Sequence, residues 1–180
     1  MSDCCATSAK NGNDRYDLVV VGAGSAGFSA AITAAEQGAQ VALIGHGTIG
    51  GSCVNVGCVP SKALIRAAEA VHHANAAATK FAGIAAQAHV VDWKAQVAQK
   101  DALGTGRRAA EYTERLPAYN NVAYHEGRAR LVEGGVKAGG QRFASDRIII
   151  ATGTRPALPT IPGIADADPL DSTAALELTE

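Results

Sequence analysis

The sequence lacks any strong excess of one charge sign. Its 180 residues include 16 Lys and Arg against 17 Asp and Glu, so the formal net charge is -1. Proteins that bind nucleic acid or an anionic membrane surface carry clusters of basic residues, and this sequence has none. We therefore expect no nucleic-acid partner and no polybasic contact with a membrane.

Long apolar runs are also missing. No stretch approaches the ~20 apolar residues that a membrane-spanning helix needs, and the N-terminus lacks the basic-then-apolar pattern of a secretory signal. These absences predict a cytoplasmic protein without a membrane segment. Internal repeats are absent too, whereas 47% hydrophobic residues and 20 glycines fit a compact globular body.

Cysteine is scarce, and two of the four cysteines stand in the segment from Gly50 to Lys62, GGSCVNVGCVPSK. In one regular helix Cys53 and Cys58 would be separated by roughly 7.5 Å of rise, whereas a disulfide needs Cα atoms about 4.4–6.8 Å apart. The backbone must therefore bend between them. Asn55 and Gly57 are the residues that tolerate unusual dihedrals there.

Cys58 is predicted to stand at the N-terminus of a helix whose first turn contains Pro60. The amide groups and dipole of a helix N-terminus favour anions, so we expect Cys58 to have a lowered pKa and to be partly thiolate at neutral pH. Cys53 would then be the more exposed, attacking thiol. Lys62 lies one turn beyond Cys58, where its ammonium would stabilise a thiolate, or would simply be solvated.

Other interpretations of the pair are weaker. Two buried structural cysteines need neither flanking glycines nor a nearby lysine, and a zinc site needs at least two further ligands at suitable spacing. In a reducing compartment such a pair cycles between thiol and disulfide. The pair is therefore interpreted as redox-active.

A glycine motif, Gly22-Ala23-Gly24-Ser25-Ala26-Gly27, precedes this segment. It follows an apolar run over Tyr16–Val21 that predicts a strand buried on both faces. A helix over Phe28–Gln37 and a second strand over Val41–Ile44 complete a βαβ unit. In that unit the three glycines make the turn, admit a pyrophosphate and let helix and strand pack closely.

The remaining segments predict an α/β fold, a Rossmann-like domain with a parallel sheet, flanking helices and a small antiparallel β-meander. Helices are expected over Ser61–Thr79 and Asp92–Tyr119, the second weakened by Gly104 and Gly106. The meander and the strand that returns to the sheet are expected in four short segments, namely Val122–His125, Ala129–Val132, Arg142-Phe143 and, for the returning strand, Arg147–Ala151.

These motifs together resemble those of the flavoprotein disulfide reductases. The resemblance runs from Tyr16 to Glu180, and the segment from Gly47 to Lys62 is similar to that of the mercuric reductases almost letter for letter. It implies FAD as the bound cofactor, NADPH as the electron donor at a site outside this sequence, and a homodimer for the full-length protein.

The resemblance implies a role for each matching position. Cys53 would be the interchange thiol, Cys58 the charge-transfer thiolate against the isoalloxazine ring, and Lys62 would lie beside that ring. The remaining implied FAD contacts are Gly22, Gly24, Gly27, Gly47, Ser52, Ala129, Thr152 and Gly153.

Two positions depart from the family pattern. Ser52 stands where the family usually has Thr, which keeps the hydroxyl, and Gly45 stands where it usually has Glu, which removes a carboxylate. That acidic residue ordinarily accepts hydrogen bonds from a ribose. From the sequence alone, Gly45→Glu is expected to tighten FAD binding, unless His46 or water already satisfies the ribose.

The expected organisation is a flexible tail over residues 1–15, an FAD-binding domain with the redox-active disulfide over 16–155, and a linker over 156–180 toward a missing nicotinamide-binding domain. The implied reaction passes electrons from NADPH through FAD and the Cys53–Cys58 disulfide to Hg(II), giving Hg(0), with Cys53 and Cys58 as transient ligands. The sequence would be a fragment, inactive alone.

Alternatives stay open at this stage. The chain would equally suit a reductase of a small organic disulfide, such as a dihydrolipoamide dehydrogenase or glutathione reductase, or a truncated FAD-binding module without catalysis. In the tail, Cys4 and Cys5 offer two soft ligands of the kind that suit Hg(II) or Cu(I), against the simpler interpretation of a disordered start.

Overall fold

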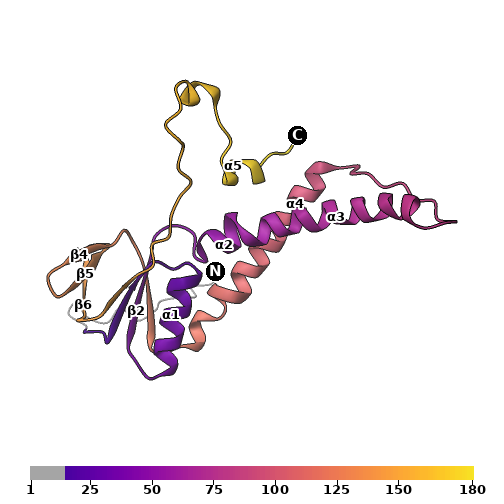
Figure 1. Cartoon of the computed structure of the whole chain (residues 1–180). Coiled ribbons are helices and arrows are strands. Elements are labelled where there is room, and N and C mark those ends of the chain that lie inside the picture. Colours follow the sequence, from indigo (N-terminus) through magenta and orange to yellow (C-terminus); the bar gives the residue numbers. More distant parts are fainter. Residues whose placement is uncertain (1–14) are drawn as a thin grey trace, which may run out of the picture. The chain divides into compact units, whose positions relative to one another are not determined.

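The computed structural model describes residues 15–180 (Figure 1). Contacts within the chain divide these residues into two compact units. The first unit comprises residues 15–49 and 115–153, and the second comprises 50–114 and 154–180. Each is described by itself. Cys4 and Cys5 lie outside the described residues, so the proposed tail ligands are not addressed by the structure.

The first unit is built on a parallel sheet of four strands in the order β3-β2-β1-β7. Val19 and Val20 of β1 and every residue of β2 are buried, as expected for strands covered on both faces. The predicted α/β fold is thereby confirmed. The strands span Leu18–Val21 (β1), Val41–Gly45 (β2), Val122–Glu126 (β3) and Ile148–Ile150 (β7).

Alternate side chains of this sheet face two different layers. On one face, Val19 and Ile44 pack against an antiparallel sheet through its Phe143, which is 1% exposed. Helix α1 (Ser25–Glu36) packs against β1 and β2. The antiparallel sheet contains β4 (Arg130–Val132), β5 (Gly135–Ala138) and β6 (Gln141–Ala144), in that order.

The assignment of Val122–His125 to the antiparallel meander is wrong. The segment forms β3, which pairs in parallel with β2, with Val41 opposite Val122 and Gly45 opposite Glu126. An alternating pattern identifies a strand without identifying its partner. The Asn121 side chain holds the start of β3 beside the end of α1, since its Nδ2 donates to the carbonyls of Ala35 and Ala39 at 2.8 Å each.

Strand β7 ends the described parallel sheet and pairs only with β1 there. It consists of Ile148, Ile149 and Ile150, of which Ile148 packs toward the buried cluster. Ile149 is 39% exposed and Ile150 is 63% exposed. The described sheet therefore has an apolar strand at one margin.

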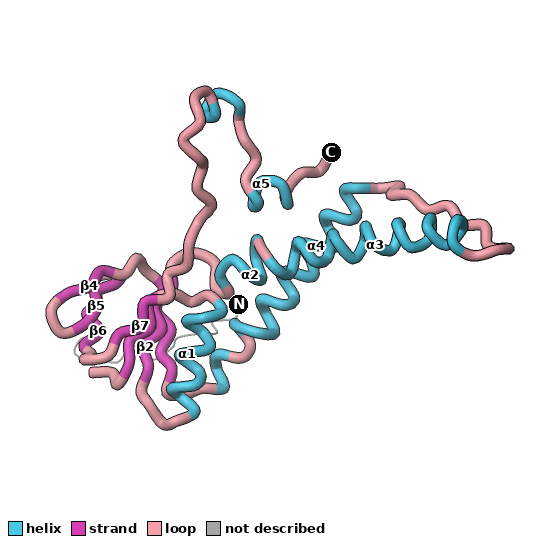
Figure 2. The backbone as a smooth tube through the Cα atoms, in the orientation of Figure 1, coloured by secondary structure: helices cyan, strands magenta, loops and turns pink. Residues whose placement is uncertain are grey.

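The second unit is mainly helical, and its helices α3 and α4 lie side by side (Figure 2). Asp92 caps α4 by accepting a hydrogen bond from Ala95 N at 3.0 Å. The helix expected over Asp92–Tyr119 is shorter than predicted, because α4 passes at Arg108 into one π-helical turn. The helices are α2 (Gly51–Val56), α3 (Cys58–Lys80), α4 (Trp93–Arg108), η1 (Ala109–Thr113), η3 (Ile164–Ala167) and α5 (Ser172–Leu176), while the short η2 (Leu116–Ala118) belongs to the first unit.

Across residues 15–180, no helix combines the length and the apolarity that crossing a membrane requires.

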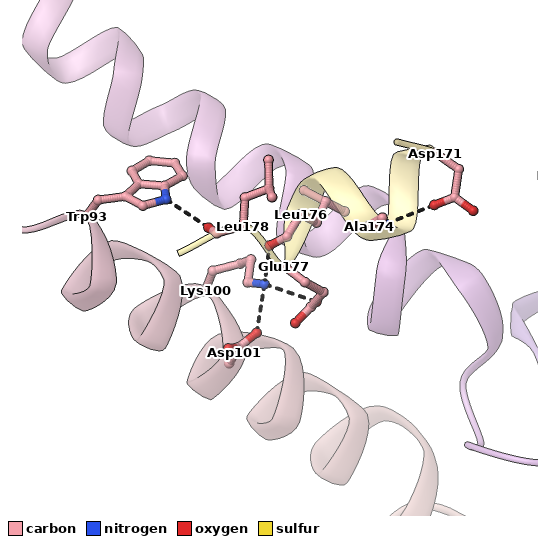
Figure 3. Close-up of polar contacts among 8 residues, drawn as sticks. All are labelled: Trp93, Lys100, Asp101, Asp171, Ala174, Leu176, Glu177 and Leu178. Carbon is pink, nitrogen blue, oxygen red and sulfur yellow. Dashed lines mark hydrogen bonds and ion pairs between the residues drawn. The ribbon is translucent and has the colours of Figure 1, made fainter. Parts of the chain in front are cut away.

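A buried lysine of α4 binds the C-terminal segment around Leu176 and Glu177 (Figure 3). Lys100 is 2% exposed, and its Nζ donates to the Leu176 carbonyl at 2.7 Å and contacts the carboxylates of Asp101 at 2.8 Å and Glu177 at 3.3 Å. Burial lowers the pKa of Lys100, but the hydrogen bonds to the two carboxylates outweigh it, so the pKa is raised. The ammonium is therefore retained although it is buried.

We predict that Lys100→Met destabilises the folded chain by about 1–3 kcal/mol at neutral pH, because the Leu176 carbonyl loses its donor. Since the pKa of Lys100 is raised in the folded state, its contribution is present below the unfolded pKa and is lost as pH rises above about 10.4. Urea unfolding at pH 7 and at alkaline pH measures both effects.

The matched control is Lys94→Met, which changes an exposed lysine of the same helix. Equal stabilities of the two variants at pH 7 would show that the buried ammonium contributes nothing.

Candidate active site

The carboxyl ends of the parallel strands meet at one edge of the first unit, where Gly22 follows β1. Its N–H donates to the Ile44 carbonyl at 2.8 Å, and its φ is 115°. A Cβ on Gly22 would lie 2.0 Å from the Ala151 carbonyl oxygen. Only glycine permits this approach, which holds the loop against the ends of β2 and β7.

The other two glycines of the motif place the start of α1. Gly24 is the N-cap residue, and no side chain makes a capping hydrogen bond there within the described chain. A Cβ on Gly27 would lie 1.8 Å from the Gly22 carbonyl oxygen and 3.3 Å from Cγ1 of Val20. The loop from Gly22 to Gly27 and the start of α1 thus form a cradle of close-packed backbone, and such a cradle suits the pyrophosphate of a dinucleotide.

The structure brings some of the remaining predicted cofactor residues to this edge. Thr152 and Gly153 follow β7, and Thr152 N lies 3.0 Å from the Cβ position of Gly22. Ala129 lies just before β4, and its partly buried side chain packs against the buried cluster. Gly47 lies beyond β2 with a φ of 78° and is exposed.

In the second unit, the predicted bend between the cysteines is confirmed. Helix α2 ends at Val56, α3 begins at Cys58, and Gly57 is the residue between them, with φ -136° and ψ -108°. A Cβ on Gly57 would lie 2.9 Å from the Ser52 carbonyl oxygen and 3.4 Å from Cα of Cys53. The missing side chain therefore lets the start of α3 lie against α2.

The expectation that Asn55 also supplies an unusual dihedral is wrong. Asn55 is a helical residue of α2, and its Nδ2 donates to the Gly51 carbonyl at 2.9 Å. A single residue, Gly57, makes the bend, so Asn55 is left to position the helix.

The two thiols contact each other. A hydrogen bond with the Cys58 side chain raises the pKa of the Cys53 thiol, and burial and the charge of Cys58 raise it further, although a hydrogen bond from the Cys58 backbone N–H lowers it. Both cysteines are free in this structure. The raised pKa keeps the Cys53 thiol protonated at neutral pH.

The exposure of the two cysteines is the reverse of the expectation. Cys58 is exposed and Cys53 is half-buried. Cys58 is the first residue of α3, with no preceding turn of its own helix to cover it, whereas Cys53 lies inside α2 against the start of α3. Ser52 and Lys62 are both exposed, and Lys62 follows Cys58 by one turn of α3.

One supporting residue was not found from the sequence. Arg108, in the last turn of α4, donates from Nη1 to Oδ1 of Asn55 at 2.8 Å. Gly104 of the same helix faces α2, since a Cβ there would lie 3.4 Å from the Val54 carbonyl oxygen, an ordinary van der Waals contact. No local pattern links an arginine with an asparagine 53 residues away, although Gly104 in a helix is a signal of close packing.

The described residues contain no cluster of three or more His, Cys, Asp or Glu side chains that could hold a metal ion. Cys53 and Cys58 nevertheless offer two adjacent sulfur ligands, which suit a soft ion.

Comparisons with known proteins agree on the kind of protein. The family described as pyridine nucleotide-disulphide oxidoreductase matches residues 16–180. The chain is 42% identical over 166 residues to a mercuric reductase of Lysinibacillus sphaericus, covering 92% of this chain and 30% of the relative. It is 39% identical over 170 residues to a mercuric reductase of Staphylococcus aureus, covering 94% and 31%. The chain thus spans about a third of the length of these relatives.

Solved structures give the same result. The HOCl-induced flavoprotein disulfide reductase RclA from Escherichia coli aligns with a TM-score of 0.73 at 28% identity, covering 92% of this chain and 34% of that one. A Cu(II) complex of the same reductase aligns with a TM-score of 0.72 at 27% identity, covering 91% and 34%.

We predict that Gly57→Ala weakens the Cys53–Cys58 disulfide about tenfold, as measured by its equilibrium with oxidised and reduced dithiothreitol. To relieve the contact with Ser52, the start of α3 must move from α2. The reduced form can make this movement, whereas the oxidised form retains strain of about 1–3 kcal/mol.

Gly106→Ala is the matched control, because nothing lies within 4 Å of its Cβ position in α4. If both variants gave the same dithiol equilibrium as the unaltered chain, the close approach at Gly57 would not determine the position of the thiols.

Proposed function

Because the chain belongs to the pyridine nucleotide-disulphide oxidoreductase family, we propose that Cys53 and Cys58 are the redox-active pair of an FAD-dependent mercuric reductase. The contact between the two thiols carries this proposal. In the net reaction NADPH is oxidised, and Hg(II) takes up two electrons and leaves as Hg(0).

The residues of the first unit fit FAD. Family membership implies FAD and a nicotinamide nucleotide as cofactors, and the cradle formed by Gly22, Gly24 and Gly27 suits a pyrophosphate. When bound, FAD supplies the two-electron relay between the nicotinamide and the disulfide. We assign the further FAD contacts to Gly47, Ser52, Lys62, Ala129, Thr152 and Gly153.

The two cysteines divide the chemistry between them. Cys53 keeps its proton at neutral pH because its pKa is raised, so it is the thiol that donates to its partner. Cys58 begins a helix, where amide groups and the dipole favour negative charge. We assign the thiolate to Cys58, the interchange role to Cys53, and the stabilising ammonium to Lys62.

Hg(II) is the substrate that the two cysteines and the similar proteins support best. Two adjacent sulfur atoms suit a soft ion, and relatives at about 40% identity are mercuric reductases. We propose a homodimeric cytoplasmic enzyme in which residues 16–155 form the FAD domain and 156–180 lead from it. Its nicotinamide site belongs to the part of the relatives that this chain does not match.

A small organic disulfide is the second candidate substrate, because the similar solved structures are those of a flavoprotein disulfide reductase. A third, non-catalytic role is an FAD-binding module. NADPH oxidation by the chain joined to the remaining family domains separates the three, since it depends on Hg(II), on lipoamide or glutathione disulfide, or on none of them.

We predict that Cys58→Ser abolishes the long-wavelength charge-transfer absorbance of the two-electron-reduced, FAD-loaded enzyme, whereas Cys53→Ser retains or strengthens it. The reason is that only a thiolate against the flavin gives this band, and Cys58 is assigned that position. Both variants should lose Hg(II)-dependent NADPH oxidation. The opposite pattern of absorbance would invert the two roles.

A further inference from the structure

A tyrosine fills the space that a side chain at position 45 would occupy. Gly45 ends β2 and is buried. A Cβ built on it would lie 2.6 Å from the Tyr124 hydroxyl oxygen, 2.9 Å from Cε2 of that ring and 3.0 Å from Cβ of Ala23. The backbone of Gly45 is not left-handed, so the phenol is what excludes a side chain there.

The register of the sheet explains how Tyr124 reaches this position. Leu43 lies opposite Tyr124, and Gly45 lies opposite Glu126. Partner residues of adjacent strands point to the same face, so Tyr124 and Glu126 share a face with the Cβ direction of Gly45. His125 points to the other face, where its ring lies 4.5 Å from that of Phe143.

The Tyr124 hydroxyl stands beside the nucleotide cradle. It lies close to Ala23, between the first two glycines of the motif, and the Gly22 N–H is bonded to the Ile44 carbonyl one residue before Gly45. In dinucleotide-binding βαβ units, an acidic residue at the end of the second strand binds the ribose hydroxyls. The phenol therefore occupies the start of the space that this acidic side chain uses.

The hydroxyl is available for a ligand. Within residues 15–180 no hydrogen bond of the Tyr124 hydroxyl is found. Burial raises the pKa of Tyr124, and the nearby Glu126 raises it further. The phenol is therefore neutral at physiological pH and both donates and accepts a hydrogen bond.

We propose that the Tyr124 hydroxyl replaces the strand-end carboxylate and hydrogen-bonds the hydroxyls of the adenosine ribose of FAD. The inference rests on the proposed function, because it requires FAD in the cradle. Gly45 and Tyr124 are then a coupled pair: the loss of the acidic side chain makes room for the phenol, and the phenol supplies the lost polar contact.

This pairing changes the sequence-based expectation for Gly45→Glu. The new side chain must displace the phenol, so the single substitution should not tighten FAD binding. The double variant Gly45→Glu, Tyr124→Val should bind FAD more tightly than Tyr124→Val alone, because the space is free for the carboxylate.

The test measures FAD affinity of the full chain after removal of bound flavin, by isothermal titration and by quenching of flavin fluorescence. Tyr124→Phe should weaken FAD binding about three- to tenfold, the effect of losing one hydrogen bond. The control Tyr119→Phe removes a hydroxyl that is bonded to Glu36 Oε1 at 3.0 Å and should leave the FAD affinity unchanged.

A change on the ligand side makes the test specific. FAD analogues that lack the 2′- or the 3′-hydroxyl of the adenosine ribose are titrated against both proteins. For at least one analogue, the unaltered chain and Tyr124→Phe should bind equally well, because one partner of the hydrogen bond is already missing. A merely structural role of the phenol would weaken FAD and both analogues by the same factor.

Three results would overturn the inference. The first is equal FAD affinity of Tyr124→Phe and the unaltered chain, and the second is an equal loss of affinity for FAD and for every analogue. The third is a loss of FAD affinity that appears with Glu126→Gln or with His46→Ala but not with Tyr124→Phe. Failure of the unaltered chain to bind FAD would instead overturn the proposed function, and the inference with it.

Discussion

Close approach of backbone segments at glycine is the constraint on which both candidate sites depend. A Cβ on Gly22 or Gly27 would lie within 2.0 Å of a carbonyl oxygen, and one on Gly57 would lie 2.9 Å from another. At the first two positions the approach places a strand end and a helix start around a space for phosphate. At the third it places two sulfur atoms together. At each site, the absence of a side chain on glycine therefore lets two backbone segments of the same unit lie close enough to form the site.

The strands of the sheet were predictable where burial alone determines the sequence. Leu18–Val21 and Val41–Gly45 are covered on both faces and are continuous apolar runs. Val122–His125, which lies in β3, was predicted as a strand but assigned to the wrong sheet, because its partner and the Asn121 contacts come from distant parts of the chain. Likewise, residue preferences predicted the start of α4 at Asp92 but not the π-helical turn after Arg108.

The same division holds for the candidate site. The spacing of Cys53 and Cys58 required a bend, and the bend lies at Gly57. Relative exposure was predicted wrongly, since it depends on which cysteine begins a helix rather than on the motif. Arg108 and Tyr124 were missed, because each reaches its target from another element and the sequence gives no local sign of the contact.

The margin of the parallel sheet has a further consequence. Strand β7 presents Ile149 and Ile150 to solvent at the end of the described sheet, without a charge or proline among its residues. Natural sheets commonly protect such a margin with charges, prolines or a covering segment, since unpaired N–H and C=O groups recruit strands from other molecules. The three successive isoleucines of β7 include none of these protective residues, so this chain in isolation carries a template for aggregation along β7.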